Sequence, residues 1–276
     1  MPASASAEGG LSLAGAGTTA KVRYGERLEL SGRVGAVGPV RLEYAARGGA
    51  WRSLRETLAA ANGSYRFRLR PRSSGAFRAV SAEGASSART VTVVARLGGR
   101  ARRHVNVGHR VLVRGRLAPG FGGRRVRLQL AAGRGWRTVD RTLTGRGGRY
   151  HASWRASGAG RYRLRVKFAG DGRNGAVSRT LRGRVYVYRP SAASWYGPGF
   201  YGNRTACGDT LAYGTLGVAH KWLPCGTKVT VRYRGRSVTV PVIDRGPYSG
   251  DREWDLTGAT KSRIGFGSTG TVWVAH

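Results

Sequence analysis

Four carboxylates lie within twelve residues of one another in a chain that is otherwise strongly basic. They are Asp244, Asp251, Glu253 and Asp255, in the stretch PVIDRGPYSGDREWDLTGAT. The whole chain of 276 residues has only 13 Asp and Glu against 49 Lys and Arg. A carboxylic acid can protonate the leaving oxygen of a glycosidic bond, and aromatic rings such as Tyr248 and Trp254 suit the apolar faces of pyranose sugars. The segment is therefore a candidate site for acid–base chemistry on a carbohydrate.

Several ordered motifs surround these carboxylates in residues 193–276. They are ASWYG, TACGDTL, GVAHKWLPCGTKV, VPVIDRGPY and DREWDLT. Together they resemble the rare lipoprotein A family of double-psi β-barrel proteins, in the disulfide-bearing form found in secreted actinobacterial proteins. Expansins and a family of endoglucanases share this barrel. The resemblance implies a six-stranded double-psi β-barrel with a short helix, peptidoglycan as substrate and lytic transglycosylase as activity.

The resemblance also assigns catalytic roles to individual residues. The Asp of the family's DRGP motif is Asp244, the expected acid/base, and the family's histidine falls on His220. The acidic residue after TA-x-G is usually Glu in the family and is the shorter Asp209 here. Asp255 falls on the Asp of the family's DLS motif, which reads DLT in this chain. One carboxyl is sufficient for a lytic transglycosylase, because the sugar's own C6 hydroxyl replaces water as the attacking group.

Each of these four residues also has a purely structural interpretation. Asp244 precedes Arg-Gly-Pro and could begin a turn, and Asp209 beside a glycine could form an Asx turn. His220 could cap or pack against neighbouring elements. Asp255 could accept backbone amides at the start of the helix that we expect from Thr257, as N-cap, to about residue 264.

Aromatic and cationic side chains near the carboxylates are candidates for substrate binding. The set that we predict is Tyr196, Tyr248, Trp195, Arg245 and Trp254. Tyr196 and Tyr248 should be exposed, because both adjoin glycine or a Gly-Pro turn. We expect Asp251 and Glu253 to be solvated loop charges.

The chain has two cysteines, Cys207 and Cys225, and both belong to this segment. They most simply form one disulfide in an oxidising compartment. Two free buried thiols are an alternative, and so is a metal site that includes His220, although that set lacks a familiar ligand spacing. We predict the disulfide, no metal and no cofactor.

The front of the chain contains an internal repeat. Residues 40–58, 62–69 and 74–80 are echoed by 126–143, 147–154 and 159–166. Alternating apolar and polar positions with frequent glycine turns predict two small β-sandwiches that look immunoglobulin-like, with arginines on the outer faces of the sheets. Trp51 and Trp136 occupy matching positions, where we expect core packing rather than a sugar platform.

The resulting fold class is all-β: two immunoglobulin-like β-sandwich repeats followed by the barrel. The predicted organisation is an N-terminal tail (1–10), two repeats (11–96 and 97–187), a linker (188–192) in which Pro190 stops strand pairing, and the barrel domain (193–276).

The net charge of +36 is concentrated in the repeats. Residues 1–189 have 39 Lys and Arg against eight acidic residues, net +31. This charge fits either Arg-rich composition on solvated faces or adhesion to anionic wall polymers. Arg-Gly fragments such as GFGGRR lie at turn spacing between aromatic strands, so we expect no specific nucleic acid as partner.

No run of about 18 apolar residues is present, so we expect no membrane span. The start, MPASASAEGG, lacks the apolar core of an intact signal peptide, although it resembles the small-residue tail near a cleavage site. We predict a secreted, cell-wall-associated monomer that cleaves peptidoglycan strands. The alternatives are an expansin-like protein that binds and loosens polysaccharide without cutting it, and a purely adhesive cationic scaffold.

Overall fold

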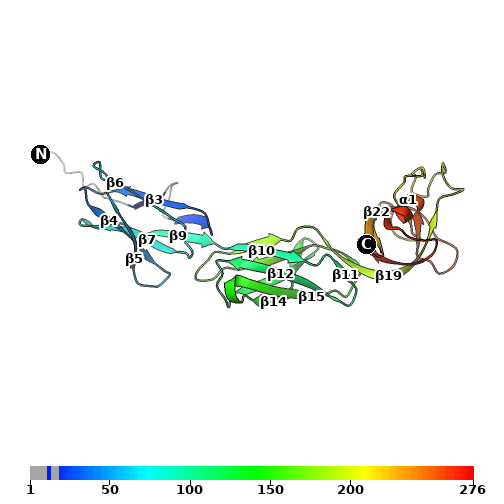
Figure 1. The fold of residues 1–276 in the computed structure, drawn as a ribbon, viewed down its shortest axis with the longest axis horizontal. Coiled ribbons are helices and arrows are strands. Elements are labelled where there is room, and N and C mark those ends of the chain that lie inside the picture. The colour runs from blue at the N-terminus through cyan, green and yellow to red at the C-terminus, as the bar shows by residue number, and fades with distance from the viewer. Residues whose placement is uncertain (1–10, 14–18) are drawn as a thin grey trace.

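The computed structural model describes residues 11–13 and 19–276, whose regular secondary structure is almost entirely β-strand (Figure 1). One short α-helix lies near the C-terminus, and a single 3-10 turn spans Arg146–Gly148. This confirms the all-β expectation. The described part of the chain is elongated, with the first strands at one end and the helix-bearing domain at the other. Neither helix is long and apolar enough to cross a membrane.

The first repeat forms two sheets that share one apolar core. Their strand orders are β1-β3-β6 and β2-β9-β7-β4-β5, with β8 paired to β7. The strands are β1 (Leu11–Leu13), β2 (Thr19–Arg23), β3 (Leu28–Arg33), β4 (Pro39–Ala45), β5 (Arg52–Leu58), β6 (Ser64–Leu69), β7 (Gly75–Ser81), β8 (Gly84–Ala85) and β9 (Arg89–Val94).

The second repeat also has two sheets around one core, ordered β10-β12-β15 and β14-β13-β17-β18. Its strands are β10 (Arg96–Ala101), β11 (His104–Asn106), β12 (Arg110–Ala118), β13 (Arg125–Ala132), β14 (Gly135–Leu143), β15 (Arg149–Arg155), β16 (Gly160–Tyr162), β17 (Leu164–Phe168) and β18 (Val177–Thr180). Matching sequence stretches form matching strands, since β4 pairs with β5 as β13 does with β14. The immunoglobulin-like class and the domain limits remain predictions.

The expected core positions of Trp51 and Trp136 are wrong. Both rings are half-buried and belong to neither core. The guanidinium of Arg78 lies 4.3 Å from the Trp51 ring centre, and that of Arg165 lies 4.4 Å from Trp136. Each tryptophan therefore packs under an arginine on the outer side of its sheet, where a cation–π contact covers it.

The C-terminal strands close into a six-stranded barrel, as expected. The order is β19-β23-β20-β22-β21-β24, and β24 pairs again with β19. The strands are β19 (Val185–Tyr196), β20 (Val218–Ala219), β21 (Lys228–Tyr233), β22 (Arg236–Asp244), β23 (Trp254–Thr257) and β24 (Gly270–Ala275).

The helix α1 (Gly258–Ile264) has the ends that its sequence predicts. The Thr257 hydroxyl accepts a hydrogen bond from Thr260 N, which satisfies an amide of the first turn. Gly265 adopts the left-handed conformation (φ 68°) that closes helices, and its N–H returns to the last turn. The helix begins directly at the end of β23 and thereby fixes the position of Asp255.

The expected break at Pro190 is wrong, because β19 runs without interruption through the predicted linker. Its first residues pair with β11 and β16, and its last residues pair with β23. At Pro190 itself only β24 is paired, opposite Trp273, so one side of the strand needs no N–H donor there. A proline is tolerated at such a one-sided position, and one strand joins the second repeat to the barrel.

Candidate active site

Strand β20 brings the two candidate catalytic carboxylates together. It lies between β22 and β23, and Ala219 pairs with Asp244 on one side and with Asp255 on the other. The preceding Val218 pairs with Val242 and Leu256, which are fully buried. Paired residues share a face and successive residues alternate between faces. Both carboxylates therefore project from the face opposite the barrel core, with only the small Ala219 between them.

A β-bulge sets the direction of Asp244. The register of β22 against β20 shifts by one residue between the Val242 and Asp244 pairs. Without this shift, Asp244 would follow the inward alternation of Val240 and Val242. The extra residue, Ile243, turns the carboxylate out of the core, which is a recurrent use of bulges near functional sites.

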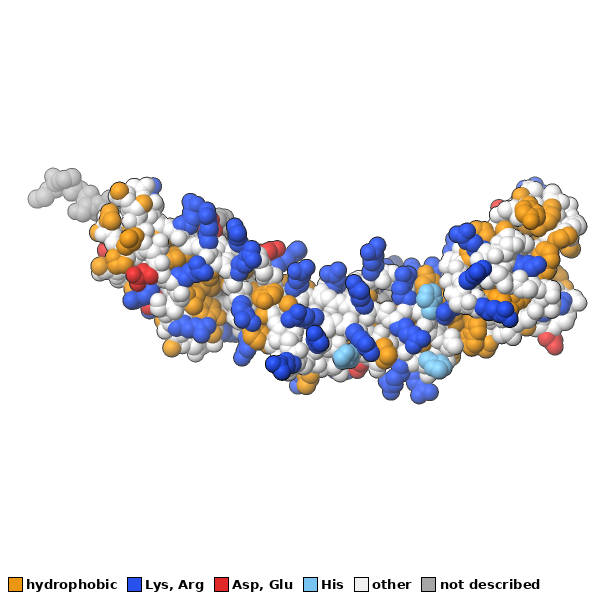
Figure 2. All heavy atoms as spheres, viewed as in Figure 1, with side chains coloured by type: hydrophobic (Ala, Val, Ile, Leu, Met, Phe, Trp, Pro, Cys, Tyr) orange, Lys and Arg blue, Asp and Glu red, His pale blue; other side chains and the backbone are white. Residues whose placement is uncertain are grey.

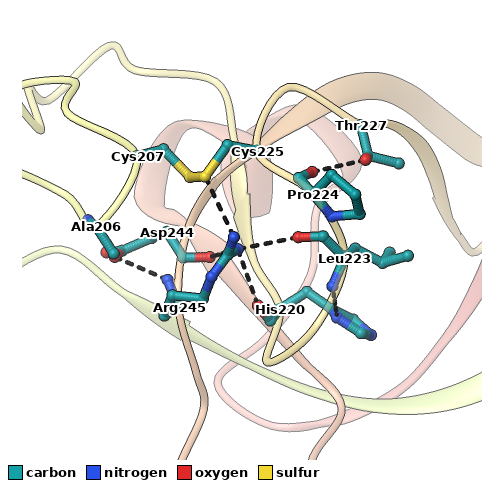
Figure 3. Close-up of a disulfide and its surroundings, with 9 residues drawn as sticks. All are labelled: Ala206, Cys207, His220, Leu223, Pro224, Cys225, Thr227, Asp244 and Arg245. Carbon is teal, nitrogen blue, oxygen red and sulfur yellow. Dashed lines mark hydrogen bonds between the residues drawn. A yellow bond between two sulfur atoms is a disulfide. The ribbon is translucent and has the colours of Figure 1, made fainter.

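The Asp244 carboxylate is anchored by backbone amides. Its Oδ1 accepts hydrogen bonds from Ala206 N and Arg245 N, each at 2.8 Å (Figure 3). Ala206 precedes Cys207, which forms the expected disulfide with Cys225. The disulfide and the Cys207 N to Ile243 O hydrogen bond hold this loop against the end of β22. The anchoring donors are therefore fixed in place by a covalent cross-link.

Arg245 does not turn its guanidinium to the carboxylate beside it. Its Nη1 donates to Leu223 O at 3.0 Å, and Nη2 lies 3.3 Å from Cys225 Sγ (Figure 3). The side chain predicted to bind substrate is thus already bonded to the loop of residues 220–225. It positions that loop next to Asp244.

Asp255 is the more deeply enclosed carboxylate. Burial raises the pKa of Asp255, and the Asp244 charge adds to this, while Ser194 and Arg252 oppose it. Its Oδ1 is buried and has no hydrogen-bond partner among the described residues. Asp255 therefore retains its proton to a higher pH than an ordinary aspartate.

Tyr196 lies beside both carboxylates and is half-buried, so the expectation that it is exposed is wrong. Burial raises its pKa, and the charges of Asp244 and Asp255 raise it further. Its hydroxyl is near Asp244 but makes no hydrogen bond of normal geometry within the described residues. The ring packs edge-on against Phe200, with centroids 6.1 Å apart.

His220 faces away from Asp244. Its Nδ1 accepts the backbone N–H groups of Trp222 and Leu223 at 3.1 and 3.0 Å, so the ring proton is on Nε2. Nε2 lies 3.5 Å from Glu253 Oε1, and the ring packs 4.5 Å from that of the buried Trp254. Figure 3 shows the imidazole directed away from the Asp244 side chain. The structure therefore places His220 in a different cluster from the proposed acid.

Glu253 is the centre of that second cluster, and the expectation that it is a solvated loop charge is wrong. Its carboxylate bonds the Arg189 guanidinium and the Ser191 hydroxyl of β19. Burial alone would raise the pKa of Glu253, but the bonds from Arg189 and Ser191 lower it to about 2. Burial lowers the pKa of His220, and Glu253 only partly compensates. The cluster ties the barrel to the strand shared with the second repeat.

The remaining predicted residues divide between surface and core. Asp209 is exposed, and its backbone carbonyl accepts a hydrogen bond from Thr205 N at 2.8 Å. Asp251 is exposed, as expected. Trp254 is fully buried, so the prediction that it binds substrate is wrong. Trp195 is half-buried under the Lys261 ammonium.

Within residues 11–13 and 19–276, no three His, Cys, Asp or Glu side chains are grouped to hold a metal ion.

The barrel domain has exposed aromatic side chains beyond the predicted substrate-binding set. Tyr248 is 77% exposed, in line with its predicted exposure, but Trp222 and Tyr213 are exposed to 84% and 83%. Trp222 follows His220 in the loop that Arg245 holds. Trp222 was not among the predicted substrate-binding residues, and no local pattern in the sequence distinguishes it from a core tryptophan.

The closed barrel, its helix and the carboxylates of β22 and β23 define a double-psi β-barrel domain. A family model described as "Lytic transglycolase" matches residues 191–276. This C-terminal region is thus a domain of the rare lipoprotein A (RlpA) type.

The same region is similar to curated proteins. It is 48% identical over 85 residues to a probable endolytic peptidoglycan transglycosylase RlpA from Synechocystis sp., and 47% identical over 82 residues to the Campylobacter jejuni endolytic peptidoglycan transglycosylase RlpA. The corresponding Pseudomonas aeruginosa protein is 40% identical over 114 residues. The matches cover 30%, 29% and 37% of this chain and 26%, 30% and 33% of the relatives. The chain therefore aligns with about a third or less of each relative.

A solved tetra-tandem repeat from the extending region of a large adhesion protein covers 92% of this chain and 72% of its own. Its identity is 14% and its TM-score 0.32, which is too low to inform the fold.

Proposed function

We propose that the barrel domain is a lytic transglycosylase that cleaves the glycan strands of peptidoglycan, in a secreted, cell-wall-associated protein. The observation that carries this proposal is the pair of carboxylates, Asp244 on β22 and Asp255 on β23, that flank Ala219 of β20 on one face of the sheet. The pKa of Asp255 is raised. The similarity of residues 191–276 to RlpA transglycosylases supports the substrate class. The Cys207–Cys225 disulfide supports an oxidising compartment.

Asp244 is the acid/base in this proposal. Its carboxyl protonates the glycosidic oxygen as the C1–O bond breaks, and the C6 hydroxyl of the same sugar attacks C1. The carboxylate then takes the C6 hydroxyl proton, so the acid is regenerated, and the product carries a 1,6-anhydro end without consumption of water. The two amide donors on Oδ1 hold the group in one orientation and leave the other oxygen for the proton transfer.

Asp255 is the neighbour of the acid rather than a second ionised carboxylate. Because its pKa is raised, it stays protonated over part of the range where an ordinary aspartate is charged. A neutral Asp255 allows Asp244 to become an anion during the reaction without a second negative charge beside it.

An expansin-like binder that does not cut is the second candidate. It is favoured by the placement of His220 against Glu253 and by the exposure of Asp209, since neither side chain contacts Asp244 in the described structure. In that case the exposed Tyr248 and Trp222 would hold glycan while no bond breaks.

Mass spectrometry of purified glycan strands after digestion by the full chain tests the proposal. We expect products with 1,6-anhydro ends, and none from Asp244→Asn over the same time. Glycan binding without anhydro products would establish the expansin-like alternative. Products with reducing ends would show hydrolysis instead.

A further inference from the structure

The outer face of sheet β10-β12-β15 in the second repeat is a surface of cations. Strand β12 alternates buried Val111 and Val113 with exposed Arg110, Leu112 and Arg114, and its partners follow the same register. The outward cationic side chains are Arg96, Arg100, Arg110, Arg114, Arg116, Arg149, His151 and Arg155, and all are exposed. We call this set the Arg face. In Figure 2, Lys and Arg side chains spread over the middle of the molecule with few acidic ones among them.

Several cations of the Arg face lie directly opposite one another. Arg100 pairs in register with Arg114, and Arg116 pairs with Arg149. Like charges at such positions destabilise a sheet. In the described structure no residue of the set forms an ion pair, and Arg116 donates only to the Gly147 carbonyl. The nearby Asp140 accepts the backbone amides of Arg141 and Ser153. An anionic ligand would therefore relieve repulsion that the protein leaves uncompensated.

Two grooves meet on this face. One has a volume of about 670 Å³ and runs over the glycines of β10 and β12. Its cationic lining is Arg96, Arg100, Arg114, Arg116 and Arg179. The other, of about 710 Å³, is lined by Arg116, Arg146, Arg149 and His151. Arg116 belongs to both, and no Asp or Glu lines either groove. Together they form a cationic track long enough for several anionic groups.

The first repeat does not share this property. On the equivalent sheet, Glu29 pairs with Arg66 at 3.2 Å and with Arg68 at 2.9 Å. Residues 11–96 have 15 Lys and Arg against five acidic residues (net +10), whereas residues 97–187 have 23 against two (net +21). An Arg-rich composition alone would give the two repeats similar net charges. The excess in one repeat indicates a site.

We propose that the Arg face binds a linear phosphodiester polymer that lacks nucleobases, such as a polyol phosphate chain. Exposed guanidinium groups suit phosphate because they donate paired hydrogen bonds to its oxygens. Single-stranded nucleic acids are usually held by aromatic rings on which bases stack. Aromatic rings are scarce on this face: Tyr150 and Trp154 of β15 are 2% and 9% exposed and belong to the core, and Tyr24, which lines one groove, is half-buried against the core of the first repeat. This inference does not depend on the activity of the barrel.

Calorimetry of the full chain with synthetic poly(glycerol phosphate) tests the proposal. Binding is measured at NaCl concentrations between roughly 50 and 300 mM, a range over which contacts to phosphate weaken strongly. The variant is Arg114→Gln, Arg116→Gln and Arg149→Gln together. The matched control is Arg33→Gln, Arg66→Gln and Arg68→Gln on the first repeat. We expect Kd to rise about tenfold or more and its salt dependence to flatten in the first triple variant. The control variant should change Kd by less than about threefold. Its arginines lie on the first repeat, outside the proposed site, and losing an arginine weakens binding only if that arginine contacts a phosphate.

Equal weakening by both triple variants would overturn the proposal, since it would mean diffuse attraction without a site. Single-stranded DNA with the same number of phosphates identifies the ligand class, and binding to DNA about tenfold tighter than to the polymer would reject a base-free ligand. Thermal unfolding separates binding from misfolding. The polymer should raise the Tm of the wild type more than that of the Arg face variant, which should itself be at least as stable as the wild type because two pairs of facing like charges are removed.

Discussion

The barrel and the second repeat use charge in opposite ways. From Pro190 onward the chain has ten Lys and Arg against five acidic residues, and two of these acids, Glu253 and Asp255, are partly buried and have pKa values shifted in opposite directions. The second repeat has 23 basic residues against two acidic ones, and its Arg face is exposed to solvent. A few partly buried charges interact strongly with one another and can take part in proton transfer. Many exposed cations instead attract anions, and this attraction weakens as the salt concentration rises. In our two proposals, this difference separates a reaction site in the barrel from a binding surface in the second repeat.

The largest expected effect is the loss of cleavage in Asp244→Asn. The substitution is nearly isosteric, but an amide can neither donate nor recover the proton. General acid–base catalysis typically accelerates a reaction by about 10²–10⁴-fold. We expect the loss of cleavage rate to lie at the upper end, because Asp244 is both the acid and the base. Rates of anhydro-product release measure the effect, and poly(glycerol phosphate) binding by the Arg face should not change.

Asp255→Asn is the matched variant. Since the pKa of Asp255 is raised, which favours its neutral form, a neutral amide should replace it with a loss of cleavage rate of about tenfold or less, equivalent to roughly 1.4 kcal/mol. If Asp255→Asn abolishes cleavage and Asp244→Asn does not, the acid is the other member of the pair.

Reduction of the disulfide should have the next largest effect, and only on the barrel. The bond closes a loop with a sequence separation of 18 residues, for which the chain-entropy model gives roughly 3 kcal/mol. Cys207→Ser with Cys225→Ser should lower the barrel's unfolding transition and leave that of the repeats in place. Differential scanning calorimetry resolves the two. A common shift of both transitions would show that the shared strand β19 couples the domains into one unit.

Acid unfolding tests the second cluster of the barrel. The pKa of Glu253 is about 2 when folded against 4.5 for a free side chain, so its stabilisation is complete above pH 4.5 and is lost as the pH falls toward 2. The shift corresponds to about 3 kcal/mol, which we reduce to about 2 kcal/mol because the side chain is 30% exposed. Glu253→Gln should be less stable at pH 7 and should lose less stability on acidification. Parallel stability–pH curves for both proteins would contradict this assignment.

Much of the barrel was predictable because its signals are local. Thr257 and Gly265 have side-chain and backbone properties that define helix ends. The disulfide followed from the presence of just two cysteines in the chain.

The errors concern contacts between residues distant in sequence. Pro190 predicts a break unless it is known that one side of β19 is unpaired there. From its local sequence Glu253 is a solvated loop charge, because its partners Arg189 and Ser191 lie over 60 residues earlier in the chain. The direction of Asp244 depends on a bulge against β20, which period-two alternation cannot reveal. Motif matching named Asp244 and Asp255 as candidates but not the neighbours, such as Ser194 and Arg252, that act on the pKa of Asp255.

The smallest expected effect compares the two repeats directly, through their matching arginine–tryptophan pairs. Arg78 also pairs with Glu43 at 2.8 Å, whereas Arg165 donates to the neutral Gln129. Arg165→Gln removes a cation–π contact and should cost about 0.5 kcal/mol. Arg78→Gln should cost about 1 kcal/mol, because it also leaves the largely buried Glu43 with only Arg41, 3.6 Å away. Urea unfolding of the single variants measures both values. Equal costs would mean that the Glu43 ion pair adds nothing, and that the acidic residues of the first repeat serve to lower its surface charge rather than to stabilise its fold.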